Sequence, residues 1–161
     1  MSNDKSSSTT MGSNARPDTI AKRNYASARE METLLWRALC DEPETLKEHL
    51  AHDCIMINPL LAPGGTCIPL SKETDPNVVD VLQAGAARKF TGFKFHGEPL
   101  VVEVDLMAVA LVYKISLFHH GRKGIREIVA SASSVWRETA GADWLLVSFH
   151  VAYADDDEEE E

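Results

Sequence analysis

The second half of this chain has the pattern of four consecutive strands joined by short turns. Residues 93–104, 107–118, 125–138 and 144–153 are rich in β-branched and alternating apolar side chains. The joints between these segments are short enough for hairpins, which connect antiparallel strands. A sheet of this kind must bury one of its faces, and the segments that could cover it come earlier in the chain.

Helical segments are expected before the strands. Between Ile20 and Leu39, apolar residues recur at i, i+3, i+4 and i+7, which predicts an amphipathic helix with Trp36 at the edge of its apolar stripe. A second, short helix is expected after Asp41, which can cap it, and a third from Asp75 to about residue 89. Residues 53–58 between them predict a strand. Helices followed by an antiparallel meander indicate an α+β domain with about three N-terminal helices on one face of a curved antiparallel sheet.

The two ends of the chain have compositions that do not suit a folded core. Residues 1–19 are rich in serine and threonine, and residues 155–161 are all acidic. Such segments bury too little apolar surface to offset their ordering entropy. We therefore expect a disordered segment at 1–19, a single domain at 20–154 and a disordered acidic tail at 155–161.

The charge balance excludes two classes of protein. The net charge is −9, but the 25 acidic residues include the seven of the tail, which leaves 18 against 16 basic residues. A nucleic-acid binder needs a basic face, so we expect no nucleic-acid partner. No apolar run approaches the length of a membrane span, so we expect no membrane partner.

The cysteines and histidines do not indicate a metal or cofactor site. Three cysteines with no CxxC pair and no secretory signal are expected to be reduced thiols in a cytoplasmic protein. His49, His52 and Asp53 have ligand-like side chains, but the segment crosses from a helix into a strand, which points them apart. We expect neither a metal nor a cofactor.

Three stretches resemble the nuclear transport factor 2-like superfamily. Residues 35–39 through 52–53 look like its first helix pair, 133–137 like its fourth strand and 143–150 like its closing strand. The last two are also similar to the association domain of calcium/calmodulin-dependent protein kinase II. The resemblance implies a cone-shaped, cystatin-like sheet closed by helices. Relatives of this kind include ketosteroid isomerases, scytalone dehydratases, SnoaL-like polyketide cyclases, transport factors and oligomerisation hubs, so the fold alone does not choose a function.

Strand alternation indicates where a pocket could form. One face of residues 125–138 carries no charge and has three small residues in a row, Ala130, Ala132 and Ser134, followed by Trp136. These small residues could leave a cavity or let a helix pack closely, and the resemblance favours a cavity. Tyr113 would bring a phenol into it. His150 falls on the opposite face of its strand from Phe149, unless a bulge reverses the assignment.

The resemblance also allows a comparison with the functional residues of ketosteroid isomerases. The position of the ketosteroid isomerase base is Asn58, whose amide cannot accept a proton at useful pH. The oxyanion-hole tyrosine aligns near Leu34, and the fourth-strand acid near Ser134. Isomerisation by that route is therefore not expected.

Two functions are left open. One is a small-molecule pocket protein that binds an apolar, polyketide-like or steroid-like ligand, with cofactor-free isomerase, dehydratase or cyclase activity as one form of it. The other is a non-catalytic homo-oligomerisation module. The expected partners are a small apolar molecule and a second copy of the chain in a homodimer, which is compatible with both functions. The candidate proton-transfer residues are His150 and Tyr113, and the candidate ligand contacts are Leu34, Asn58, Ala132, Ser134, Trp136 and Phe149.

Overall fold

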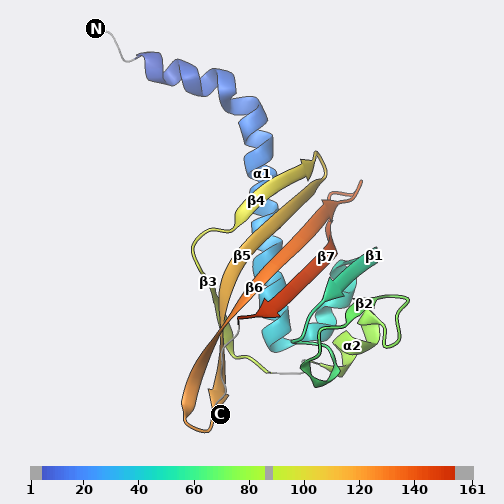
Figure 1. The fold of residues 1–161 in the computed structure, drawn as a ribbon. Helices are drawn as coiled ribbons and strands as arrows, with labels where there is room; N and C mark the ends of the chain where they lie inside the picture. Colours follow the sequence, from blue (N-terminus) through green and yellow to red (C-terminus); the bar gives the residue numbers. More distant parts are fainter. Residues whose placement is uncertain (1–4, 86–88, 155–161) are drawn as a thin grey trace.

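The computed structural model describes the backbone of residues 5–85 and 89–154, and the side chains of those residues from residue 20 onward. A long helix and a short one precede the first strand, and most of the sheet follows the last helix (Figure 1). The elements are α1 (Lys5–Asp41), η1 (Pro43–His49), β1 (Leu50–Ile57), η2 (Pro63–Gly65), β2 (Pro69–Ser71), α2 (Val78–Ala84), β3 (Gly92–Phe95), β4 (Leu100–Asp105), β5 (Ala108–Gly121), β6 (Gly124–Glu138) and β7 (Trp144–Tyr153).

All seven strands belong to one curved, open sheet. Their order is β2-β1-β7-β6-β5-β3, and β4 also pairs with β5. Every pairing is antiparallel except that of β1 with β7, which is parallel. The expected α+β architecture with helices on a curved sheet is confirmed, with one parallel pair in place of a purely antiparallel order. A hairpin pattern could not reveal that pair, because its two strands are far apart in the sequence.

Helix α1 lies across one face of the sheet, which we call the inner face (Figure 1). The apolar stripe of the helix packs there, and Ala28, Leu35 and Trp36 are buried. Trp36, expected at the edge of the stripe, is in fact fully enclosed. The opposite side of the sheet, which we call the outer face, has no helix over it in the part of the chain that the structure describes.

The expected strand at 93–104 is two strands. The chain turns between β3 and β4, where Gly97 adopts a φ of 69° that favours glycine. Both halves still pair with β5, β3 near its C-terminal end and β4 near its N-terminal end.

The two short helices also differ from expectation. The second is a 3-10 helix whose N-cap residue, Glu42, makes no side-chain cap, and Asp41 is instead the last residue of α1. The third is shorter than predicted. It begins after Asn77, whose side chain accepts a hydrogen bond from the Asp80 backbone N–H, and it ends at Gly85 with a φ of 94°.

Helix α1 begins before the expected start of the folded domain at residue 20. The backbone of residues 5–19 continues α1, and Figure 1 shows this part extending beyond the sheet. Residues 1–4 and the acidic residues 155–161 lie outside the described part of the chain. The disorder expected at 1–19 and 155–161 and the domain limits at 20 and 154 stay predictions.

Candidate functional site

A buried carboxyl group lies at the centre of the inner face. Glu32 occupies the apolar stripe of α1 between Ala28 and Leu35 and is fully buried. The Ser134 hydroxyl and the Trp136 indole N–H each donate to its Oε1 at 2.6 Å. The side chains of one helix and one strand thus meet around a single acid.

Two further side chains complete this cluster. The Tyr113 hydroxyl donates to Glu32 Oε2 and accepts a hydrogen bond from the Trp36 indole N–H at 2.6 Å. Trp36, Glu32, Tyr113, Ser134 and Trp136 form one connected network, which we call the Glu32 network. Every polar side-chain group in it has a partner, as a buried polar network requires.

Burial controls the protonation of the network. Loss of solvent raises the pKa of Glu32 above its ordinary value, and this effect outweighs the hydrogen bonds from Ser134, Trp136 and Tyr113 that lower it. Burial also raises the pKa of Tyr113 well above its usual range, and the neighbouring Glu32 adds to that rise. The tyrosine therefore stays neutral and acts as a hydrogen-bond donor.

Four of the expected ligand contacts come together on the inner face. Ala132, Ser134 and Trp136 of β6 and Phe149 of β7 are all buried there. Phe149 packs edge-on against Trp36, with ring centroids 5.7 Å apart. Glu32 and Trp36 thus occupy the space beside the small residues of β6. Of the two alternatives that those residues left open, close packing of a helix is the one observed at this point.

The other two expected contacts do not join them. Leu34 is 44% exposed on α1, away from the apolar stripe. Asn58 is fully buried at the end of β1, where its Oδ1 accepts from the Leu60 backbone N–H and its carbonyl accepts from Leu61 and Ala62. Asn58 thereby shapes the turn after β1, although its Nδ2 has no hydrogen-bond partner among the described residues.

The two expected proton-transfer residues lie on opposite faces of the sheet. Tyr113 points to the inner face and joins the Glu32 network, whereas His150 is exposed on the outer face of β7. His150 is the cross-strand partner of Ser133 on β6. The assignment of His150 to the face opposite Phe149 is confirmed, and the sheet separates His150 from Tyr113.

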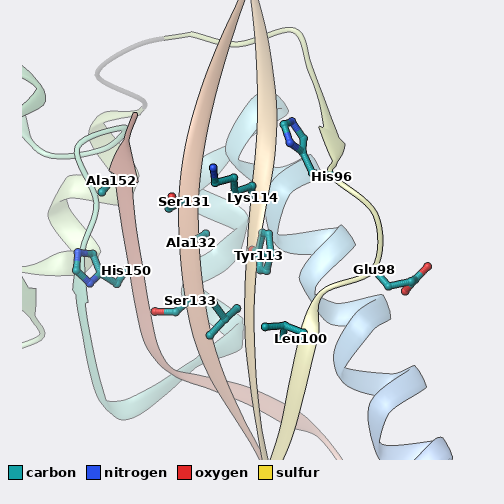
Figure 2. A pocket seen from close by; sticks show the side chains of 11 residues that line it. His96, Glu98, Leu100, Tyr113, Lys114, Ser131, Ala132, Ser133, His150 and Ala152 are labelled. Carbon is teal, nitrogen blue, oxygen red and sulfur yellow. The ribbon is translucent and has the colours of Figure 1, made fainter. Parts of the chain in front are cut away.

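The outer face is hollowed where β5, β6 and β7 lie side by side (Figure 2). The hollow has a volume of about 530 Å³. It combines polar and apolar side chains, with Lys114, Ser131, Ser133 and His150 among the former and Leu100 and Val112 among the latter. Tyr113 and Ala132 also border it, although strand alternation turns their side chains inward.

Apolar side chains are unusually exposed on this face. Leu100 of β4 is 74% exposed and Val112 of β5 is 52% exposed, and the two are direct cross-strand partners. Val102 and Ile55, on the same face, are also exposed. A second hollow of about 430 Å³ lies between β1, β2 and β7, and His150 borders both hollows. The outer face therefore carries a broad, weakly polar surface.

The described residues contain no group of three or more side chains placed to hold a metal ion. Likewise, no helix in the described part of the chain is both long and apolar enough to span a bilayer.

Glu32 and Trp36 are the residues of this region that the sequence reasoning missed. A signal for Glu32 was present, because it interrupts an otherwise apolar stripe on the buried side of α1. Such a residue must find partners when it is buried. The partners come from β5 and β6, roughly a hundred residues later, so they could not be identified from local spacing.

Comparisons with known proteins give structural matches only. Neither a scan against protein-family models nor a search of curated proteins found a match. The association domain of Caenorhabditis elegans CaMKII is similar in structure, with a TM-score of 0.60 at 17% identity over 84% of this chain and 98% of that domain.

Two further structures agree with this match. A nuclear transport factor 2-like superfamily protein from Salmonella enterica has a TM-score of 0.59 at 13% identity and covers 87% of this chain and 94% of its own. A candidate ketosteroid isomerase from Parabacteroides distasonis has a TM-score of 0.58 at 15% identity, covering 77% and 85%. At these identities the likeness establishes architecture, and the chain has the nuclear transport factor 2-like fold.

Proposed function

We propose that the protein is a non-catalytic module that associates with itself through the outer face of its sheet. The observation that carries this proposal is the exposure of Leu100, Val102, Val112 and Ile55 on a face that no helix covers in the described part of the chain. An antiparallel sheet that faces water on one side is ordinarily polar on that side. Leu100 and Val112 are cross-strand partners, and exposed apolar groups gathered on such a face are typical of a protein interface.

Self-association is the simplest use of this surface. A two-fold dimer uses the same patch on both copies, so a strongly charged patch would repel its copy. The residues outside the acidic segment 155–161 are nearly neutral in sum, and the centre of the outer face carries serines and apolar residues beside Lys114 and His150. Among the similar structures, one from C. elegans is named as the association domain of CaMKII, and one from S. rosetta is named as a CaMKII hub.

Catalysis has less support from the same residues. His150 and Tyr113 are on opposite faces, and Glu32 is buried with its oxygens occupied by three donors. A general acid or base has to reach its substrate within hydrogen-bond distance. Tyr113 and His150 border the same hollow, but the Tyr113 hydroxyl is turned inward and donates to the buried Glu32.

A second function has one specific observation in its favour. The hollow of about 530 Å³ has the size of a small-molecule site and pairs the apolar Leu100 and Val112 with the polar Lys114 and His150. An apolar ligand with one polar end would suit it. In this second function the ligand would bind on the outer face, whereas the sequence predicted a pocket on the face that carries Ser134 and Trp136.

Sedimentation velocity and native mass spectrometry test both functions. At micromolar concentration the wild type is expected to be a dimer or larger. The double variant Leu100→Glu, Val112→Glu is expected to be a monomer, and circular dichroism should show that this variant is still folded. Ile125→Glu is the matched control, because Ile125 is 66% exposed but lies at the tip of the β5–β6 hairpin.

Three results would decide between the functions. A monomeric wild type at tens of micromolar would refute self-association. Loss of the dimer in the Ile125 control would refute this particular surface. A bound organic mass that survives in the wild type and is absent from the double variant would favour the ligand function.

A further inference from the structure

The hairpin of β5 and β6 projects beyond the rest of the sheet (Figure 1). On one side, β3 stops pairing with β5 at Phe118. On the other, the last backbone hydrogen bond between the described residues of the β7 side and β6 runs from the Ala154 N–H to the Val129 carbonyl. Residues 119–128, which we call the ribbon, therefore pair only within the β5–β6 hairpin among the described residues. The edge of β6 in the ribbon is open.

The ribbon is strongly basic, and its basic side chains form no ion pair with the described acidic residues. Its basic side chains are His119, His120, Arg122, Lys123 and Arg126. Its one acid, Glu127, accepts a hydrogen bond from the Ser116 hydroxyl. Among the described residues, the ion pairs are those of Arg29 with Glu98 and Arg137 with Asp53, so the ribbon cations take part in none.

The acidic residues 155–161 follow directly from the base of this ribbon. They are three aspartates and four glutamates, and they begin one residue after the hydrogen bond to Val129. β7 pairs with β6 so that Tyr153 faces Ala130 and Ala152 faces Ser131. If this register continued, Asp157 would lie opposite Arg126.

The length of the acidic segment also fits. Seven residues reach at most about 25 Å when extended. The ribbon edge from Val129 to Lys123 spans about 20 Å at the rise of a strand. The segment can therefore reach the tip of the ribbon without moving β7.

We propose that residues 155–161 dock along the open edge of β6 in the ribbon of their own chain and neutralise Arg122, Lys123 and Arg126. The docking is held mainly by charge, because aspartate and glutamate are poor strand formers and repel one another. It gives an otherwise unpaired strand edge a cover, which limits pairing with other chains. It also keeps foreign polyanions from the basic tip.

The test is an NMR comparison of the full-length protein at low ionic strength. In the variant with all seven acids of 155–161 changed to their amides, the amide signals of residues 122–128 are expected to shift from their wild-type positions. In about 1 M salt, where charges are screened beyond about 3 Å, the two spectra should coincide in this region. The control Glu44→Gln, Glu48→Gln, Glu73→Gln removes exposed acids elsewhere and should leave the ribbon signals in place.

A charge exchange identifies the partners. Arg126→Asp should displace the signals of residues 155–161, and the double variant Arg126→Asp, Asp157→Arg should restore most of the wild-type ribbon shifts. Identical ribbon signals in the wild type and the seven-amide variant at low salt would refute the docking. Ribbon shifts that grow with protein concentration would refute it as a contact within one chain, because they would show docking between chains.

Discussion

Glu32 is the residue on which the inner face depends. It is an acid placed in the middle of the apolar stripe of α1, fully buried, and it accepts hydrogen bonds from Tyr113, Ser134 and Trp136. Removing one partner of a buried hydrogen bond leaves the other to bear its desolvation cost, about 1–3 kcal/mol for each group. The network therefore makes the helix and two strands depend on one side chain.

We predict that Glu32→Leu lowers the free energy of unfolding by about 3 kcal/mol or more, because it orphans three donors at once. Glu32→Gln keeps the shape and one acceptor oxygen, so it should cost less than Glu32→Leu. Urea unfolding followed by tryptophan fluorescence measures both variants. If Glu32→Leu and Glu32→Gln lowered the free energy of unfolding equally, the acceptor oxygens would not be important for stability.

The raised pKa of Glu32 predicts a pH dependence. In the folded protein this carboxyl keeps its proton at pH values above about 4.5, where the unfolded chain has lost it. The folded state then binds more protons, so the Glu32 contribution to the free energy of unfolding falls as pH rises from about 4.5 to the native pKa.

Glu32→Gln cannot titrate and should lose this part of the slope. The difference in unfolding free energy between wild type and Glu32→Gln, measured by urea unfolding across this range, isolates the effect from other groups. A difference that stays constant with pH, or that favours the wild type increasingly as pH rises, would contradict the predicted sign.

At the scale of elements, β6 contributes side chains to both faces of the sheet. Its alternation turns Ala130, Ala132 and Ser134 to the packed inner face and Ser131 and Ser133 to the outer face. The inner positions are small because α1 lies close to them, with Glu32 itself in hydrogen-bond contact with β6. An enlarged side chain should therefore be costly on one face only.

We predict that Ala130→Val lowers the free energy of unfolding by about 1–3 kcal/mol, since it overpacks a site with no exposed surface. Ser131→Val, one residue away on the exposed face, should change it by less than about 0.5 kcal/mol. Chemical unfolding of the pair at a fixed protein concentration is the measurement. A cavity beside Ala130 would instead make Ala130→Val neutral or stabilising.

At the scale of the whole molecule, the fold leaves one face of its sheet without a covering layer in the described residues. A domain of this size ordinarily buries each apolar surface against another layer. A second copy would supply that layer here, which is why the outer face and not the inner network carries the proposed function.

Assembly of this kind makes stability depend on concentration. The Tm of the wild type is expected to rise as protein concentration increases, because association favours the folded state by mass action. The Tm of Leu100→Glu, Val112→Glu should stay constant over the same range. Differential scanning fluorimetry over a hundredfold dilution series checks this, and a constant Tm for the wild type would argue against an interface.

Much of the fold could be predicted because it depends on local patterns. The amphipathic stripe from Ile20 to Leu39 and the alternation in residues 107–118, 125–138 and 144–153 predicted α1, β5, β6 and β7. The predicted strand bounds and pairings were wrong where the local pattern was weak, or where pairing with distant strands outweighed it. The break between β3 and β4 depends on how each half reaches β5, and the parallel pairing of β1 with β7 joins distant segments.

The candidate site was less predictable for the same reason. Alternation alone placed Ser134 and Trp136 on one face and His150 on the other, since the period of a strand is a local property. Only the tertiary structure could decide that Glu32 and Trp36 fill the space beside Ser134 and that Leu34 faces solvent. The sequence by itself determined which elements form and which side chains share a face. Which faces meet, and which of them is left open, was decided by packing between segments that are far apart in the chain.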